Sequence, residues 1–123
     1  MVNSAYNKTT IAERSGLTPR QVQFYTEQGI IVPEVDPGEG RGKTRLYSDH
    51  NLFQFGIVKV LVDLGLQVLH VKRIVEQVDP LMSKAYVSIS DSSISISDSM
   101  PLGHFLFIDF KAIERKISGV ENG

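Results

Sequence analysis

The segment Thr18–Gly29, TPRQVQFYTEQG, constrains the fold most, because both ends of a short helix are specified in it. Thr18 is a favourable N-cap, and Pro19 suits the first position of a helix. Gln21 stands three residues after the cap and completes a capping box. Gly29 supplies the left-handed residue that commonly ends a helix. The sequence therefore predicts one short helix with well-defined ends.

A second short helix is expected just before it, in TIAERSG, with Thr9 or Thr10 as its N-cap and Gly16 at its end. Two short helices joined by about three residues that include a glycine form a helix-turn-helix, which DNA-binding proteins place in the major groove. Side chains on the second helix that can donate hydrogen bonds to phosphates or base edges are Arg20, Gln21, Gln23 and Tyr25. The alternative is a helix pair that serves only packing, since many ordinary helices carry a capping box.

A glycine-rich basic segment follows. The β-branched run at 30–32 is expected to form a strand, and Leu46 and Tyr47 a return strand. The residues between them include two prolines and three glycines, which indicate a turn or loop. Together they predict a wing whose Arg41, Lys43 and Arg45 would contact phosphates or the minor groove. The alternative is a solvated surface loop.

Two longer helices are expected next. Ser48 can cap a helix at 49–64 that is apolar around most of its circumference, so this helix is central to a core or shared with a partner. A helix at 68–78 carries a stripe of valines, with Lys72 and Arg73 outward. Asp79 and Pro80 end it.

The tail has a β pattern. Apolar residues alternate with serine on both sides of a turn at 91–93, which predicts a hairpin, and an apolar strand and a short helix follow at 105–117. Two or three strands with one apolar face are marginal alone, so we expect them to pack on the first domain or on a second copy of the chain. We predict a homodimer interface at 84–117. Its expected residues are Val87, Ile89, Ile94, Ile96, Phe105, Phe107, Ile113 and Ile117.

The charge distribution sets a condition on any DNA-binding hypothesis. The net charge is −1, with nine Lys or Arg and eight Asp or Glu in residues 1–78. The few cations must therefore converge on one face. Glu13, Glu27, Glu34 and Glu39 must then point elsewhere.

Several other classes of protein are disfavoured. There is no cysteine, so disulfides, thiolate metal sites and a cysteine nucleophile are excluded. His50, His70 and His104 lack the spacing of metal ligands or of a catalytic pair, and GEGRG lacks the Lys-Ser/Thr of a phosphate-binding loop. No apolar stretch approaches about 20 residues, and the N-terminus has no signal-peptide pattern. We expect a cytoplasmic protein that is not an enzyme, with no cofactor, metal or membrane partner.

Residues 9–78 resemble the DNA-binding domain of the mercury-resistance-regulator (MerR) family. The resemblance is carried by three segments in the family's order: TIAERSGLTPRQVQFYTEQGII, RGKTRLYS and DLGLQVLHVKRIVEQV. The resemblance implies a winged helix-turn-helix domain with its two-helix packing unit, which we place at 9–80. With the polar, loose N-terminus at 1–8 and the small β-rich appendage that the tail pattern predicts at 84–118, we expect a mainly helical α+β fold.

The chain departs from the family pattern in the second helix and in the tail. Gln23 stands where the family usually has arginine, and Thr26 where glutamate is usual. Phe24 replaces the first of two tyrosines, and we expect it in the core. The long helix that commonly pairs with its twin in this family is absent from the tail pattern.

Together these features predict a dimeric, sequence-specific DNA-binding regulator of transcription with a pseudo-palindromic site. The resemblance further implies that it distorts promoter DNA so that RNA polymerase can engage it, or represses by occupying it. The expected DNA-contacting residues are Thr10, Thr18, Arg20, Gln21, Gln23, Tyr25, Arg41, Lys43, Arg45 and Tyr47. One alternative is an antitoxin-like autoregulator that binds a partner protein through the β-rich tail. Another is a small-molecule sensor with its ligand between the tail and the helices.

Overall fold

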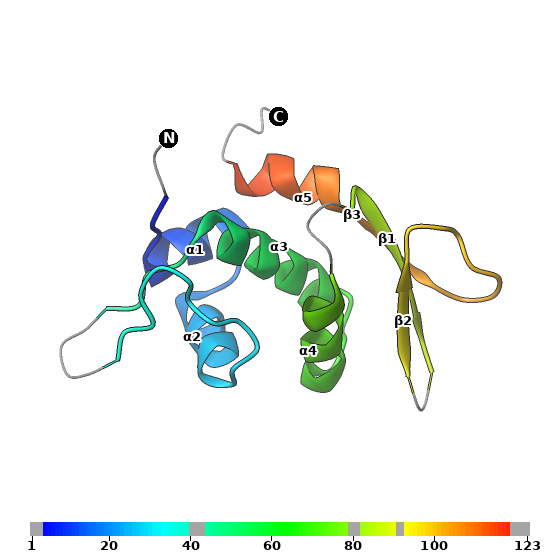
Figure 1. Ribbon diagram of the computed structural model, residues 1–123, viewed down its shortest axis with the longest axis horizontal. Helices are drawn as coiled ribbons and strands as arrows, with labels where there is room; N and C mark the ends of the chain where they lie inside the picture. The colour runs from blue at the N-terminus through cyan, green and yellow to red at the C-terminus, as the bar shows by residue number, and fades with distance from the viewer. Residues whose placement is uncertain (1–3, 40–43, 79–81, 91–92, 119–123) are drawn as a thin grey trace.

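Helix α3 (Asp49–Asp63) is the central element, with α1 (Lys8–Ser15), α4 (Val68–Gln77) and α5 (Phe110–Ile117) packed against it (Figure 1). The computed structural model describes residues 4–39, 44–78, 82–90 and 93–118. Helix α2 (Pro19–Glu27) packs on α1, and β1 (Lys84–Ile89), β2 (Ile94–Ser97) and β3 (Leu106–Asp109) form a small antiparallel sheet. The fold is mainly helical and of the α+β class, as predicted.

The ends of α2 agree with the sequence prediction. Thr18 Oγ1 accepts a hydrogen bond from the Gln21 backbone amide at 3.1 Å, and Gln21 Oε1 accepts one from the Thr18 amide at 2.9 Å. This is the reciprocal arrangement of a capping box. Gly29 follows with a φ of 74°.

The start of α1 was predicted wrongly. The helix begins at Lys8, and its cap is Asn7, whose side-chain oxygen accepts from the Thr10 amide at 2.9 Å. Asparagine is at least as good a cap as threonine, so the earlier cap prevails. Just before it, the backbone of Tyr6 pairs with that of Tyr47, with both N–H···O distances at 2.8 Å.

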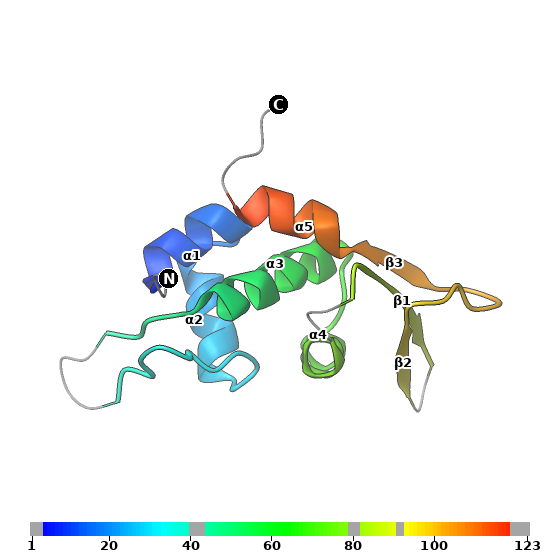
Figure 2. The same ribbon diagram turned by 45° about the horizontal axis from the view of Figure 1, so that its top comes forward.

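The wing is closed at a different place from the one expected. Residues 30–32 do not form a strand; instead Ile30 and Ile31 are buried in the core. The backbone pairing occurs further along, between Asp36 and Leu46. The described parts of the wing lie at the opposite end of the molecule from the sheet (Figures 1 and 2). Arg41 and Lys43 lie outside the described residues.

The sides of α2 are also assigned differently from the prediction. Val22, Tyr25 and Thr26 are buried, which is the spacing of one helix face. Phe24 points to another side and is 39% exposed, so the expectation that it lies in the core is wrong.

The tail forms the predicted hairpin and a third strand, in the order β2-β1-β3. On one face of the sheet, Val87 stands opposite Ile96 on β2 and Leu106 on β3. This face belongs to the same hydrophobic cluster as the helices. The other face carries Tyr86, whose ring centroid lies 5.3 Å from that of Phe107.

Helix α5 packs closely on α3 at Gly56. A Cβ atom placed on Gly56 would lie 2.6 Å from Ile113 Cγ2 and 3.1 Å from Ile117 Cγ2, so only glycine permits this approach. The rings of Phe53 and Phe110 meet edge to face beside it, with centroids 5.4 Å apart. The tail therefore shares one core with the helices. The division into domains at 9–80 and 84–118 stays a prediction.

Candidate nucleic-acid interface

The outward side of α2 presents Arg20 and Gln23 to solvent, with Gln21 half-buried beside them. Helix α2 projects from the side of α3 opposite to α5 (Figure 1). Its position is fixed by the contact with α1 and by the buried Val22, Tyr25 and Thr26. The predicted base-contacting side chains of α2 are therefore held on a rigid and accessible element.

The side chain of Gln23 is held from two directions. Lys8 Nζ donates a hydrogen bond to Gln23 Oε1 at 3.3 Å, and Gln23 Nε2 donates one to Glu27 Oε2 at 3.0 Å. Glu27 thus lies on this side of α2, against the expectation that it points elsewhere. Lys8 was missed by the sequence prediction, which placed it in a loose terminus; the signal that could have found it was Asn7 as an earlier helix cap.

Lys8 also lies beside the base of the wing. It lines a hollow of about 340 Å³ together with Gly38, Thr44, Arg45 and Tyr47, and none of these residues is acidic. Gly38 has a φ of 72°, and a Cβ atom there would lie 2.6 Å from Arg45 Cγ. Glycine at 38 therefore allows the wing to turn and Arg45 to pass close to its backbone.

Tyr25 and Tyr47 were expected to donate to phosphates, and this does not fit the structure. Tyr47 is fully buried, and its hydroxyl lies 2.8 Å from Thr26 Oγ1. Tyr25 is 6% exposed, and burial raises the pKa of its phenol. Both rings instead belong to the hydrophobic core, and the Tyr47 hydroxyl links the end of the wing to α2. The sequence prediction also missed Phe24 as a candidate DNA-contacting residue. Its side chain lines a surface hollow together with Arg20, Gln23 and Glu27.

The remaining predicted residues on this side have defined places. The Thr18 hydroxyl is occupied as the cap of α2, and Thr10 is half-buried on α1. Neither is brought into the hollow that contains Lys8 and Arg45.

The residues predicted for a dimer interface divide into three groups. Val87, Ile113 and Ile117 are buried within the chain itself, so the expectation that they face a partner does not fit. Ile94, Ile96 and Phe105 are half-buried. Ile89 and Phe107 are 38% and 50% exposed and remain accessible.

Other kinds of site were sought in the part of the chain that the structure describes. Within it, no three His, Asp or Glu side chains are grouped closely enough to hold a metal ion. No helix there is both long and apolar enough to cross a bilayer.

The chain has two short helices, the second of which is capped and faces outward, and a loop follows whose two sides pair at Asp36 and Leu46. This arrangement defines a winged helix-turn-helix protein. The family model described as MerR HTH family regulatory protein matches residues 6–78. The match covers more than half of the chain, and the chain belongs to this family.

Curated relatives and a solved structure agree with this assignment. Uncharacterized HTH-type transcriptional regulators of Mycobacterium bovis and Mycobacterium tuberculosis are 28% identical over 67 residues. That stretch is 54% of this chain but only 30% of the length of these relatives. The crystal structure of a MerR-family transcriptional regulator from Bacillus cereus superposes with a TM-score of 0.53 at 21% identity. It covers 62% of this chain and 55% of that one, and this likeness supports the fold.

Proposed function

We propose that this protein binds double-stranded DNA in a sequence-specific manner and regulates transcription. One observation carries the proposal: Lys8 is hydrogen-bonded to Gln23 on α2 and shares a hollow with Arg45 of the wing. The predicted base-contacting helix and the basic wing are therefore parts of one continuous surface. Family membership supports the same function.

In this proposal α2 enters the major groove. Arg20 suits the acceptor edge of guanine, and the exposed Gln23 suits the donor and acceptor pair of adenine. Gln21 uses its side-chain oxygen in the capping box and offers its Nε2 as a donor. Phe24 adds an apolar contact of the kind made with the thymine methyl group. Glu27 orients the Gln23 amide through the 3.0 Å hydrogen bond.

The wing supplies contacts that do not depend on sequence. Lys8 and Arg45 neutralise phosphates at its base, and Arg41 and Lys43, which lie outside the described residues, serve the same function. Phosphate contacts of this kind fix the register of a protein on the duplex and supply much of its affinity. With a net charge of −1, binding depends on this local cluster rather than on overall attraction.

The protein acts as a homodimer on a pseudo-palindromic promoter site, which it distorts so that RNA polymerase can engage, or which it occupies to repress. Exposed Phe107 and Ile89 on the sheet, and the outer edges of β2 and β3, are the surfaces for the second copy. A two-fold dimer presents two copies of α2 to two half-sites. Phe107→Glu tests the interface by light scattering: a monomer is expected, whereas an unchanged dimer would exclude this surface.

An electrophoretic shift assay with the DNA upstream of the protein's own gene tests DNA binding. We expect a retarded complex that survives an excess of unrelated duplex and that weakens with salt. Absence of any shift at low salt would contradict the proposal.

A second candidate function is protein interaction through the tail. The observation that favours it is a cluster of three aromatic side chains on the outer face of the sheet. The ring centroid of Tyr86 lies 5.3 Å from those of both Phe105 and Phe107. In this case the tail binds another protein, and the helices serve autoregulation. A stable complex of two different chains on purification, lost in Phe107→Glu, would favour this function over the homodimer.

A further inference from the structure

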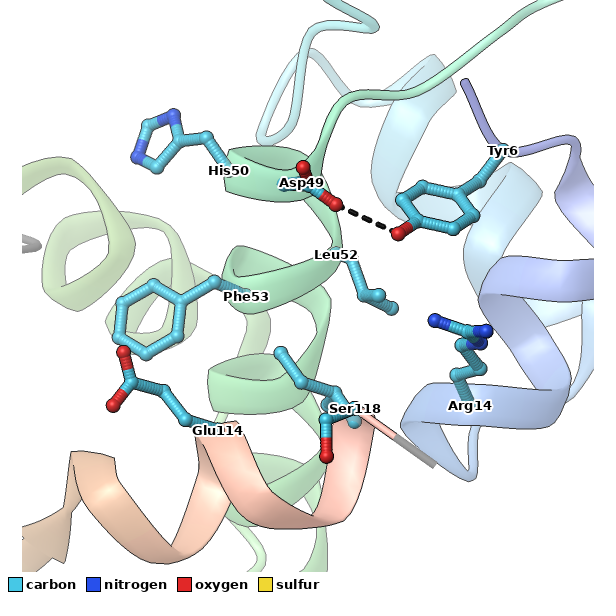
Figure 3. Close-up of a pocket in the computed structure, with 9 residues that line it drawn as sticks. Tyr6, Arg14, Asp49, His50, Leu52, Phe53, Glu114 and Ser118 are labelled. Atoms are coloured by element: carbon cyan, nitrogen blue, oxygen red, sulfur yellow. Dashed lines mark hydrogen bonds between the residues drawn. The ribbon is translucent and has the colours of Figure 1, made fainter. Parts of the chain in front are cut away.

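A hollow of about 600 Å³ lies between α1, the first turns of α3 and the end of α5. Figure 3 shows Tyr6 and Arg14 on one side of it, Phe53 and Glu114 on the other, and Leu52 between them. Its volume is in the range of pockets that bind small organic molecules. It is separate from the hollow that contains Lys8 and Arg45.

The floor of this hollow is apolar. Leu52 and Phe53 come from α3 and Ile117 from α5, and each is buried to at least nine-tenths of its surface. An aromatic ring or a short hydrocarbon body placed against them would lose its contact with water, which is favourable. The floor therefore suits an organic ligand better than a small inorganic ion.

The charged groups around the rim differ in their hydrogen-bond and ion-pair partners. Asp49 accepts a hydrogen bond from the Tyr6 hydroxyl at 2.7 Å, and Glu114 lies 3.8 Å from Lys111. His50 contacts Glu34 at 3.0 Å.

Arg14 is different. Its guanidinium lies 5.3 Å from the centre of the Tyr6 ring, which holds it at the hollow. Among the described residues no carboxylate lies within 4.0 Å of Arg14. Within the described lining, Arg14 is thus the positively charged side chain at the hollow, and no carboxylate of the described residues neutralises it. A planar guanidinium binds carboxylates through two parallel hydrogen bonds.

We propose that this hollow is a binding site for a small organic monocarboxylate with an apolar body, such as an arylcarboxylate. The carboxylate pairs with Arg14, and the body lies against Leu52, Phe53 and Ile117. Asp49 and Glu114 on the rim disfavour ligands with several negative charges. The site joins α1, the first helix of the helix-turn-helix, to α5 in the tail. It does not depend on the proposed DNA binding.

Benzoate is the probe, and amide chemical shifts of the ¹⁵N-labelled full chain are the readout. We expect saturable shifts that centre on Arg14, Phe53 and Ile117. Benzamide has nearly the same shape without the charge, and it should bind at least about tenfold more weakly, because hydrogen bonds between charged groups are the stronger ones. Arg14→Gln should weaken benzoate to a similar extent, and Arg73→Gln, on α4, should leave binding unchanged.

A second variant keeps the proposal falsifiable if Arg14→Gln fails to fold. Glu114→Gln removes a negative charge from an exposed rim position, so benzoate should bind more tightly. The proposal is overturned if benzoate gives no saturable shifts at these residues. It is overturned equally if benzamide matches benzoate, or if neither Arg14→Gln nor Glu114→Gln changes the affinity. All of these results are independent of any DNA-binding assay.

Discussion

The hydroxyl oxygens of Thr26 and Tyr47 lie 2.8 Å apart in a buried contact between α2 and the end of the wing. Thr26 Oγ1 also lies 2.8 Å from the Val22 carbonyl and donates its proton there. Since a hydroxyl has one proton, Tyr47 must be the donor in the contact with Thr26. This bond joins the two parts of the proposed DNA-binding surface, at the position where the family usually has glutamate.

Tyr47→Phe should lower the free energy of unfolding by about 1 kcal/mol, the usual net value of one buried hydrogen bond. Thr26 keeps its bond to Val22 in this variant, so no buried donor is left unpaired. Urea unfolding followed by circular dichroism measures the change. Tyr86→Phe is the matched control, because it removes the same hydroxyl while the ring keeps its contacts with Phe105 and Phe107, and its stability should stay within about 0.5 kcal/mol of wild type. Equal effects in the two variants would contradict the assigned bond.

Gly56→Ala should destabilise the protein although alanine favours helices. The added Cβ meets Ile113 Cγ2, a methyl group that moves away only if Ile113 leaves the χ1 rotamer that a β-branched residue strongly prefers in a helix. We expect a net loss of about 1 kcal/mol, within a range of about 0 to 2 kcal/mol, because overpacking costs about 1–3 kcal/mol and alanine returns about 1 kcal/mol of helix propensity. Urea unfolding of Gly56→Ala, Ile113→Ala and the double variant measures it.

The double variant should lose less stability than the sum of the two single variants, because Ile113→Ala removes the clashing methyl group. If Gly56→Ala is instead more stable than wild type, then α5 does not pack on α3 as described.

Glu34 gives a pH dependence. A hydrogen bond from the Ser48 hydroxyl, together with hydrogen bonding and charge from His50, holds the pKa of Glu34 below its ordinary value of 4.5. A carboxyl whose pKa is lower in the folded state stabilises the fold above its unfolded pKa, and this contribution is lost as the pH falls through the folded value. The stability advantage of wild type over Glu34→Gln should therefore be present near neutral pH and shrink below about pH 4.5.

Urea midpoints at several pH values measure that difference, and a difference that grows in acid would contradict the assignment. His50→Ala should also move the pKa of Glu34 upward, which the carboxyl ¹³C shift reports. The same shift change would not occur if His50 made no contact with Glu34 in solution.

Arg45→Ala should weaken binding to all DNA sequences alike. If Arg45 contacts one phosphate, the slope of log affinity against log salt should become shallower by about 1. Fluorescence anisotropy from about 50 mM to about 200 mM salt measures the slope. Arg115→Ala is the matched control, since Arg115 lies on α5, on the far side of α3 from α2 (Figure 1). An unchanged slope in Arg45→Ala would remove this residue from the phosphate-contacting set.

Local signals allowed the ends of α2 and the hairpin to be predicted from the sequence. The reciprocal bonds of Thr18 and Gln21 form within three residues, and the alternation around Val87 and Ile89 reflects the two faces of one strand. Patterns of this kind depend on nearby residues alone, so tertiary contacts did not alter them.

The errors had different causes. Phe24 was placed in the core because of its apolar ring, whereas helical spacing from Val22 favours Tyr25 and Thr26, which are the residues that α2 buries. Lys8 was missed because Asn7 and Thr10 are both acceptable caps, and only the structure selects between them. The hollow beside Arg14 joins residues from both ends of the chain, which no sequence spacing indicates.

The most direct test of the central claim, that α2 contacts base edges, is selection of binding sites from random duplex DNA by wild type and by Gln23→Ala. Wild type should enrich a site with two related half-sites. Gln23→Ala should enrich the same site with relaxed preference at one position in each half, and Arg115→Ala should reproduce the wild-type site. The account would be contradicted if wild type enriched no sequence. It would also be contradicted if both Gln23→Ala and Arg20→Ala, selected in parallel, enriched the same motif as wild type.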